Sequence, residues 1–514
     1  MRVFGVGGIL SSEYSAGRVI RQVSQPVPMK EESMSTDRLT RRGFLGSGAV
    51  AGAGLLWSSS LGGCSLVDAK DGHEGLHAGS ESQAKNVIFL VADGMNTGTW
   101  SLADYYLQHQ NSKQNRGARR SEWVHLYAER LVNRALMETC SANSLVTDSA
   151  AAGSAWANGQ RVNNGSLNVS PEGKILTPIH DLVQKSGRAT GLVTTTRMTH
   201  ATPASFATSV PKRGMEDEIA LQYLDKGVDV LLGGGSRHFS AETRKDGADL
   251  FSQFRKSGYE IMGNRDQLLG ATEIPERLLG TFWKTHLPYT LDSQHNQEIA
   301  KSVPTLAEMM RAALKVLDRK PNGFLLQVEA GRVDHAGHGN DPGAIVHDQL
   351  AFDECIAVAL EYTRDNPDTM VVVTTDHGCG GCQLNGMGAS YQDTDKTFFN
   401  GIDALKSSYE NLRNQFGVLS RAEFRALVED SIQLVLTDDQ LDTLDGLKST
   451  DYGVSTQIRK WHDPISRTGV NFTSSNHTGE FVELSAWGPG SGNFGTFVTN
   501  TDVNAVVRRV LALS

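Results

Sequence analysis

The chain has 514 residues, of which 39% are hydrophobic and 21% are charged, a composition typical of folded globular proteins and not of fibrous or disordered ones. Its formal net charge of -9 argues against a general nucleic-acid-binding protein, because such proteins carry positive surfaces that neutralise phosphates. An anionic small substrate is not excluded, since bound metal ions can supply positive charge locally.

The N-terminal segment has the features of an export signal. The sequence TRRGFL at residues 40–45 precedes an uncharged run, rich in Gly and Ser, that ends at Cys64. This arrangement resembles a twin-arginine signal and predicts export from the cytoplasm. Residues 1–33 have no export features of their own, so Met34 is an alternative start of the chain. We therefore expect an N-terminal extension at 1–33, a signal at 34–64 and a linker at 65–84.

Cys64 ends the sequence LGGC, which resembles a lipoprotein cleavage site. Two alternatives stay open. In the first, Cys64 becomes a lipidated first residue that anchors the protein to the membrane of the cell envelope. In the second, it is an incidental cysteine at the end of an ordinary signal, and the protein is periplasmic.

Short apolar segments along the rest of the chain are typical of strands that are buried on both faces. They are 87–92 (VIFLVA), 191–195 (GLVTT), 228–232 (VDVLL), 324–328 (FLLQV) and 370–374 (MVVVT). Amphipathic segments such as 305–317 separate them. Buried strands that alternate with helices predict an α/β fold with a doubly wound, mostly parallel central sheet flanked by helices.

The segment LVTDSAAAGSAWANG at residues 145–159 predicts a helix that begins near Asp148 and Ser149. The plain interpretation is a capped helix. The alternative is that Ser149 is a nucleophile, because free N–H groups and a partial positive charge at a helix N-terminus can hold an anion.

A polar segment at about 385–470, rich in helix formers, interrupts the strand series. We expect a helix-rich inserted subdomain there, within a main domain at 85–514. It is a candidate for shaping the mouth of a site or for a dimer contact.

Acidic, histidine and hydroxyl side chains follow four of the predicted strands. They are Asp93; His200 and Thr202; Glu329, Asp334, His335 and His338; and Asp376 and His377. In open α/β sheets, ligands bind beyond the carboxyl ends of the strands. Each group alone has a plain alternative, such as a helix cap or a turn, but together they predict a metal site at one edge of the sheet.

The types of donor atom in this set favour two kinds of metal. Mixed oxygen and nitrogen donors, as in Asp334 with His338 and Asp376 with His377, suit zinc. The all-oxygen set of Glu329, Thr202 and a shared Asp93 suits magnesium. Two zinc ions about 4 Å apart can hold the attacking and leaving oxygens of a phosphoryl transfer, which gives Ser149 a use as the nucleophile.

Six motifs together resemble the metal-dependent alkaline phosphatase family, in family order from Asp93 to His477. They are VADGM, TDSAAAGSAW, HATPASFA, VEAGRVDHAGH, TTDHG and NHTGEF. The resemblance implies that residues 85–514 form the catalytic domain and that small phosphate monoesters are the substrates. It also implies two Zn²⁺ ions, one Mg²⁺ ion and a homodimer.

The resemblance also implies roles for single residues. Ser149 would become a phosphoserine, and Arg213, eleven residues after Thr202, would grip the phosphate; the alternative for Arg213 is a surface arginine. One zinc would be held by Asp334, His338 and His477, the other by Asp93, Asp376 and His377, and magnesium by Asp93, Thr202 and Glu329. His200 and His335 stand where some members carry Asp and Lys, which leaves the third metal open between magnesium, zinc and cobalt.

The remaining cysteines are too few for a disulfide scaffold. Cys379 and Cys382 could form a redox or metal-binding pair, but a local disulfide or two unreactive thiols is the favoured interpretation, since no second pair completes a zinc ribbon.

Three competing functions were weighed against phosphate monoester hydrolysis. A sulfatase is disfavoured because Ser149 is not followed by the x-Pro-x-Arg sequence that such a nucleophile needs. A phosphodiesterase is disfavoured because its substrate is not a dianion, so it would not need Arg213, which suits the dianionic phosphate of a monoester. A non-catalytic metal-binding or phosphate-binding protein would have no use for Ser149.

Overall fold

The computed structural model describes residues 82–514, apart from 115, 118 and 448–451. The expected N-terminal extension, the export signal, Cys64 and most of the linker lie outside the described residues. Within the described part of the chain, no helix combines the length and the apolar character that crossing a bilayer requires.

Ten strands form one sheet, in the order β14-β2-β13-β8-β1-β7-β3-β4-β6-β5. The strands from β8 to β5 are parallel, whereas β13 is antiparallel to both of its neighbours. The strands are β1 (Asn86–Val91), β2 (Asn133–Glu138), β3 (Ala189–Arg197), β4 (Val230–Gly234), β5 (Tyr259–Met262), β6 (Arg277–Thr281), β7 (Phe324–Glu329), β8 (Thr369–Thr374), β13 (Val482–Trp487) and β14 (Phe497–Thr499). The predicted doubly wound, mostly parallel sheet is confirmed, with the five predicted strands as β1, β3, β4, β7 and β8.

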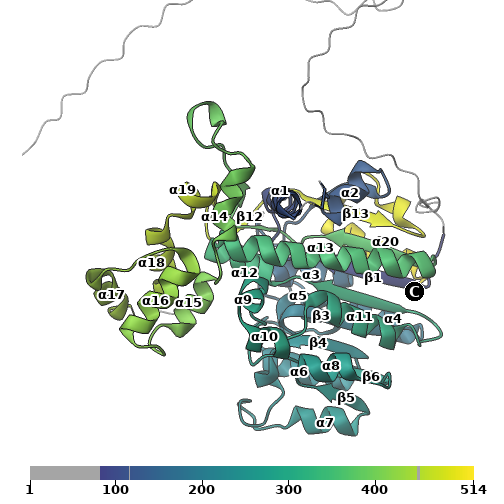
Figure 1. Ribbon diagram of the computed structural model, residues 1–514. Helices are drawn as coiled ribbons and strands as arrows, with labels where there is room; N and C mark the ends of the chain where they lie inside the picture. The colour runs from purple at the N-terminus through teal and green to yellow at the C-terminus, as the bar shows by residue number, and fades with distance from the viewer. Residues whose placement is uncertain (1–81, 115, 118, 448–451) are drawn as a thin grey trace, which may run out of the picture. The chain divides into compact units, whose positions relative to one another are not determined.

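Helices cover both faces of the sheet (Figure 1). Because side chains alternate along a strand, Ile88 and Leu90 of β1 pack on one face and Val87 and Phe89 on the other. The first face packs against α1 (Thr97–Lys113), α2 (Glu122–Ala128), α8 (Arg265–Gly270), α11 (Leu306–Leu317) and α13 (Pro342–Asp365). The second packs against α3 (Ser149–Asn158), α4 (Ile179–Lys185), α5 (Ala201–Ala207), α6 (Glu216–Lys226), α7 (Leu250–Lys256) and α20 (Asn500–Val510).

The amphipathic segment at 305–317 forms α11, as predicted. Thr305 is its N-cap and makes a capping box with Glu308, which satisfies free N–H groups at the start of the helix. The short helices α9 (Thr290–His295) and α10 (Gln297–Ser302) precede it, and α12 (Arg332–Gly339) follows β7.

A helical segment lies between two short strands, β10 (Gln383–Leu384) and β11 (Val470–Asn471), which pair in antiparallel fashion. Its helices are α14 (Asn400–Asp403), α15 (Tyr409–Gln415), α16 (Arg421–Ile432), α17 (Asp438–Asp445), α18 (Gly453–His462) and α19 (Pro464–Thr468). Buried side chains such as Leu412, Phe424 and Ile458 form an apolar cluster within it. A second antiparallel pair, β9 (Gly378–Cys379) with β12 (His477–Thr478), lies beside the carboxyl end of β8.

Candidate active site

The predicted metal ligands lie at the carboxyl ends of neighbouring parallel strands. Val91 of β1 is in register with Glu329 of β7 and with Thr374 of β8. Asp93 and Asp376 therefore follow their strands at the same level as Glu329, and all three carboxylates are fully buried. Parallel pairing explains why residues more than 280 positions apart meet at one edge.

Ser149 is the first residue of α3, and Asp148 is its N-cap. The Asp148 carboxylate accepts a hydrogen bond from the Ala151 N–H at 3.0 Å, so the capped-helix interpretation is correct. Ser149 is nevertheless buried, and its Oγ lies 3.2 Å from Nε2 of His377. The helix thus aims the serine at the predicted ligands.

Small residues allow α3 to approach α5 closely. A Cβ atom on Gly153 would lie 2.4 Å from the Ser205 Oγ, which is too short for any side chain there. The predicted run of small residues therefore has a packing reason, and it brings Ser149 close to the end of the sheet.

One group of donor atoms contains Asp334, His338, His477 and Cys379, whose ligand atoms all lie within 4.8 Å of one another. The Nε2 atoms of the two histidines are 3.1 Å apart. Nδ1 of His338 is 2.7 Å from the Ser475 carbonyl and Nδ1 of His477 is 2.8 Å from the Thr147 carbonyl. Since those carbonyls accept the Nδ1 protons, both Nε2 lone pairs are directed into the group, as metal-binding histidines require.

A second group contains Asp93, Asp334 and His377. Nε2 of His377 lies 3.1 Å from Asp376 Oδ2 and 3.7 Å from Asp93 Oδ1. Burial opposes ionisation of Asp376, but His377, the Gly94 N–H and His477 together hold the pKa of Asp376 well below its usual value.

A third group contains Asp93, Glu329 and His200, and the Thr202 Oγ1 lies 3.3 Å from Asp93 Oδ2. Burial raises the pKa of Glu329 to about 7. Burial, and next the charge of Asp376, raise the pKa of Asp93 well above its usual value. This group thus joins two carboxylates of the predicted all-oxygen set to an imidazole nitrogen of His200, and the choice of magnesium stays a prediction.

Several carboxylate oxygens in these groups are buried without a hydrogen-bond partner among the described residues. They are Asp93 Oδ1, Glu329 Oε1, Asp334 Oδ1 and Asp376 Oδ2. Buried carboxylates without partners are costly, and cations are the groups that compensate them. The donor set therefore fits bound metal cations.

Arg213 lies beside Asp148, the residue that precedes Ser149. Its Nη1 donates to Asp148 Oδ2 at 3.0 Å, and its Nη2 is 3.1 Å from Nε2 of His200. The side chain is 28% exposed, so it is open to solvent at the position expected for a phosphate-binding group. The guanidinium is therefore held in place by two partners, and its role in phosphate binding stays a prediction.

Sequence reasoning missed several residues next to the site. His286 follows β6, and its ring lies 4.3 Å from that of His335 and 5.4 Å from that of His200. Arg332 is buried and its Nη1 is 2.8 Å from Nδ1 of His335. His286 is a lone histidine after a strand that was not predicted, so the local sequence gave no signal for it. Arg332, in contrast, lies inside the VEAGRVDHAGH motif.

Cys379 and Cys382 are both free and buried, so they are thiols and not the local disulfide. Only Cys379 belongs to a ligand group among the described residues.

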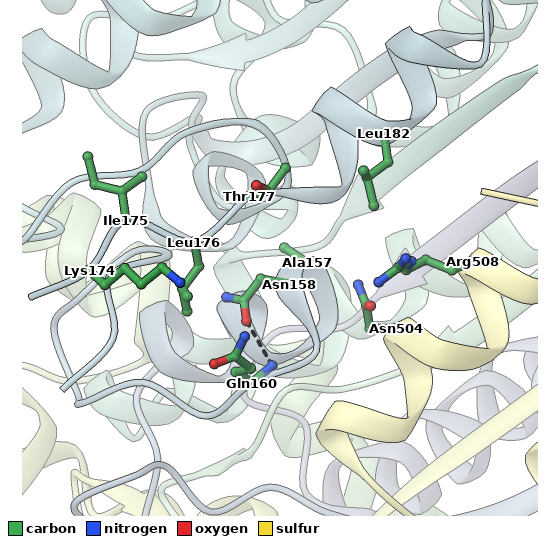
Figure 2. Close-up of a pocket in the computed structure, with 10 residues that line it drawn as sticks. All are labelled: Ala157, Asn158, Gln160, Lys174, Ile175, Leu176, Thr177, Leu182, Asn504 and Arg508. Carbon is green, nitrogen blue, oxygen red and sulfur yellow. Dashed lines mark hydrogen bonds between the residues drawn. The ribbon is translucent and has the colours of Figure 1, made fainter. Parts of the chain in front are cut away.

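A separate cavity of about 300 Å³ lies at the other end of α3. Figure 2 shows Asn158 and Gln160 on one side of it and Asn504 and Arg508 of α20 on the other. None of the predicted site residues lines it, so this cavity is not part of the metal-ligand cluster.

Comparison with known proteins agrees with this geometry. The alkaline phosphatase family model matches residues 84–513. Alkaline phosphatase 3 of Bacillus subtilis is 29% identical over 444 residues, which cover 84% of this chain and 90% of that protein. The repressible alkaline phosphatase of Saccharomyces cerevisiae is 36% identical over 325 residues, which cover 58% of this chain but only 55% of that protein. The crystal structure of Thermus thermophilus alkaline phosphatase superposes with a TM-score of 0.76 at 32% identity, covering 85% of this chain and 93% of the other.

Proposed function

The chain belongs to the alkaline phosphatase family of phosphomonoester hydrolases, and we propose that it hydrolyses phosphate monoesters through a phosphoserine on Ser149. The observation that carries this proposal is the 3.2 Å distance between the Ser149 Oγ and Nε2 of His377, at the start of a helix and beside buried carboxylates that each have one oxygen without a hydrogen-bond partner among the described residues. A protein that only bound phosphate would have no need of a buried serine at that point.

In this proposal two zinc ions and one magnesium ion bind within the cluster that these groups form. Asp334, His338 and His477 hold the first zinc; Asp93, Asp376 and His377 hold the second; and Asp93, Thr202 and Glu329 hold magnesium, with His200 alongside. The bound ions supply positive charge that favours the serine alkoxide and stabilises the phosphoryl oxygens.

Ser149, the N-terminus of α3 and Arg213 have the other roles in the proposed reaction. The Ser149 hydroxyl loses its proton and its Oγ forms a bond to phosphorus while the bond from phosphorus to the alcohol oxygen breaks, and that oxygen takes up a proton. Water then breaks the bond between phosphorus and the Ser149 Oγ, which regains a proton, and inorganic phosphate is released. The N-terminus of α3 faces the phosphate with its partial positive charge. Arg213 holds two non-bridging oxygens with its two terminal nitrogens, which favours the dianion of a monoester over the monoanion of a diester.

We also propose that the protein is exported by the signal at 34–64 and acts outside the cytoplasm as a homodimer. Its location is periplasmic, or on the cell envelope if Cys64 carries a lipid. Mass spectrometry of the mature N-terminal peptide distinguishes a lipidated Cys64 from an unmodified end, and light scattering of the purified protein measures its oligomeric state.

Hydrolysis of an aryl phosphate monoester and of the matching diester tests the activity. With zinc and magnesium present, we expect a large monoester preference that a chelator abolishes. Ser149→Ala removes turnover while inorganic phosphate still binds. A diester preference would contradict the role of Arg213, and turnover of neither ester would favour the non-catalytic binding protein.

A further inference from the structure

Cys379 lies directly opposite a predicted metal ligand. In the short antiparallel pair β9–β12, Cys379 is in register with His477, and Gly380 donates its N–H to the Asn476 carbonyl at 2.8 Å. Side chains of directly opposed residues project from the same face of such a pair, with Cβ atoms about 5 Å apart. The thiol and the imidazole therefore share one face, and Cys379 is fully buried there.

The sulfur belongs to the group of Asp334, His338 and His477. The Sγ and the three other ligand atoms all lie within 4.8 Å of one another. Asp334 Oδ1, on a residue that is only 4% exposed, has no hydrogen-bond partner among the described residues. A cation among these four atoms would compensate that oxygen and would have the sulfur within reach.

A glycine on the neighbouring helix leaves room for the sulfur. A Cβ atom on Gly337 of α12 would lie 3.0 Å from the Cys379 Cβ and 3.1 Å from its Sγ. A side chain at position 337 would therefore crowd Cys379, and glycine allows the close contact with the helix that carries Asp334 and His338. The close approach of α12 and β9 places Sγ in the group.

We propose that the Sγ of Cys379 is a fourth protein ligand of the metal ion held by Asp334, His338 and His477. The proposal rests on the metal centre of the proposed function. On binding, the thiol releases its proton to solvent and the thiolate donates an electron pair to the ion. One sulfur, two nitrogens and one oxygen form a donor set for zinc, cobalt or cadmium and not for magnesium, since thiolates prefer softer cations.

Cys382 provides a matched control. It is buried like Cys379 and lies three residues further along the chain, but it belongs to none of the ligand groups among the described residues. Its N–H donates to Asn96 Oδ1, an interaction that a change of side chain to alanine does not remove.

X-ray absorption at the zinc edge of the zinc-loaded wild-type protein tests the proposal without any mutation. A zinc–sulfur shell at about 2.3 Å is expected beside nitrogen and oxygen shells at about 2.0–2.1 Å. Cys379→Ala loses the sulfur shell and Cys382→Ala keeps it. In competition with a chelator, Cys379→Ala binds zinc at least about tenfold more weakly, whereas Cys382→Ala binds it as the wild type does.

The possible failures are distinguishable. If the wild type binds zinc with nitrogen and oxygen ligands only, Cys379 is not a ligand, while the metal centre of the proposed function stands. If the wild type binds no zinc, both proposals fall. Near-ultraviolet circular dichroism of the two variants shows whether each is folded. If Cys379→Ala is unfolded, the X-ray absorption spectrum of the wild type still tests whether Cys379 is a ligand.

Discussion

Arg213 Nη1 donates a hydrogen bond to Asp148 Oδ2 at 3.0 Å, so the residue directly before Ser149, the proposed nucleophile, orients the arginine proposed to hold phosphate. The same carboxylate accepts N–H groups from Ala151 and from Gly165, each at 3.0 Å. The two side chains are 28% and 20% exposed, and solvent therefore weakens the ion pair. Its main effect is on the direction of the guanidinium and not on stability.

Two substitutions at Asp148 separate capping from orientation. Asp148→Ala removes the cap and should lower the free energy of unfolding by about 1 kcal/mol. It also frees Arg213, so we expect weaker inhibition by inorganic phosphate, because a guanidinium that is not preorganised binds less tightly. Asp148→Asn keeps the capping oxygen for Ala151 but loses the acceptor of Gly165 and Arg213, so it should lower the free energy of unfolding less than Asp148→Ala and weaken phosphate inhibition as Asp148→Ala does. Urea unfolding and inhibition kinetics measure the two effects, and wild-type phosphate inhibition in both variants would show that Asp148 does not orient Arg213.

Arg213 itself should determine the preference for monoesters. Arg213→Ala removes two charge-assisted hydrogen bonds to phosphate, so kcat/KM for a monoester should fall by about 10² or more. Arg213→Lys keeps the charge but lacks the fork of two donors, and should recover only part of the loss. The matching diester serves as the control, since its rate should change much less. Equal losses on both esters would contradict this role.

The sheet was predictable where its strands are central. Strands such as β1 and β8 are buried along their whole length because helices cover both faces, so they appear as continuous apolar runs. β2 alternates between buried and exposed residues and pairs with an antiparallel neighbour, and β5 is a short edge strand; neither gives such a run.

The site was predictable where a ligand directly follows a predicted strand, as for Asp93 and Asp376. His286 was not predictable, because it follows a strand that was not recognised and meets His335 only through the fold. Cys379 and Cys382 are equivalent in sequence, and only the pairing of β9 with β12 separates them.

Removing the metal ions should destabilise the protein. The cluster holds several buried carboxylates that repel one another, and bound cations would offset that repulsion. We expect a chelator to lower Tm and added zinc to restore it, with about 1.4 kcal/mol of stabilisation for each tenfold increase in free zinc above Kd. Differential scanning calorimetry measures the change, and chelator already saturated with zinc is the control. An unchanged Tm in excess chelator would mean that the cluster holds no stabilising metal.

The ion pair between Arg332 and Glu410 joins the helix that carries Asp334 to α15 of the inserted segment. Arg332 Nη2 donates to Glu410 Oε1 at 2.6 Å, and the guanidinium lies 3.7 Å from the centre of the Tyr289 ring. Arg332 is 2% exposed, so its charge is compensated mainly by Glu410 and not by solvent. Glu410→Gln leaves the buried charge of Arg332 uncompensated and should lower the free energy of unfolding by about 1–3 kcal/mol. This range is below that of a fully buried ion pair because the Glu410 side chain is 34% exposed.

Glu429→Gln provides the control for Glu410→Gln, since Glu429 is an exposed residue of α16 in the same inserted segment. It should change the free energy of unfolding by less than about 0.5 kcal/mol. Equal stability of the two variants in urea unfolding would show that the Arg332–Glu410 pair contributes nothing to the attachment of the segment.

Asp348 should make stability depend on pH between about 4 and 7. Burial raises its pKa to about 7, although Arg332 acts in the opposite direction, and its carboxylate accepts hydrogen bonds from the N–H and the hydroxyl of Thr290. The unfolded chain has the ordinary pKa near 4, so in this interval the folded protein binds more protons than the unfolded protein. Stability from this group is therefore full below pH 4 and is lost as the pH rises towards 7.

Asp348→Asn isolates that contribution, because an amide has the same shape, can still hydrogen bond to Thr290 and does not titrate. The free energy of unfolding of the wild type minus that of Asp348→Asn should fall by up to about 1.4 kcal/mol per pH unit between pH 4 and 7 and level off outside this interval. Subtraction cancels the titrating groups that do not interact with Asp348; Asp292, whose charge acts on Asp348, is the exception. Urea unfolding of metal-free protein at several pH values measures the difference, and a difference that stays constant across the interval would show that Asp348 keeps an ordinary pKa in the folded protein.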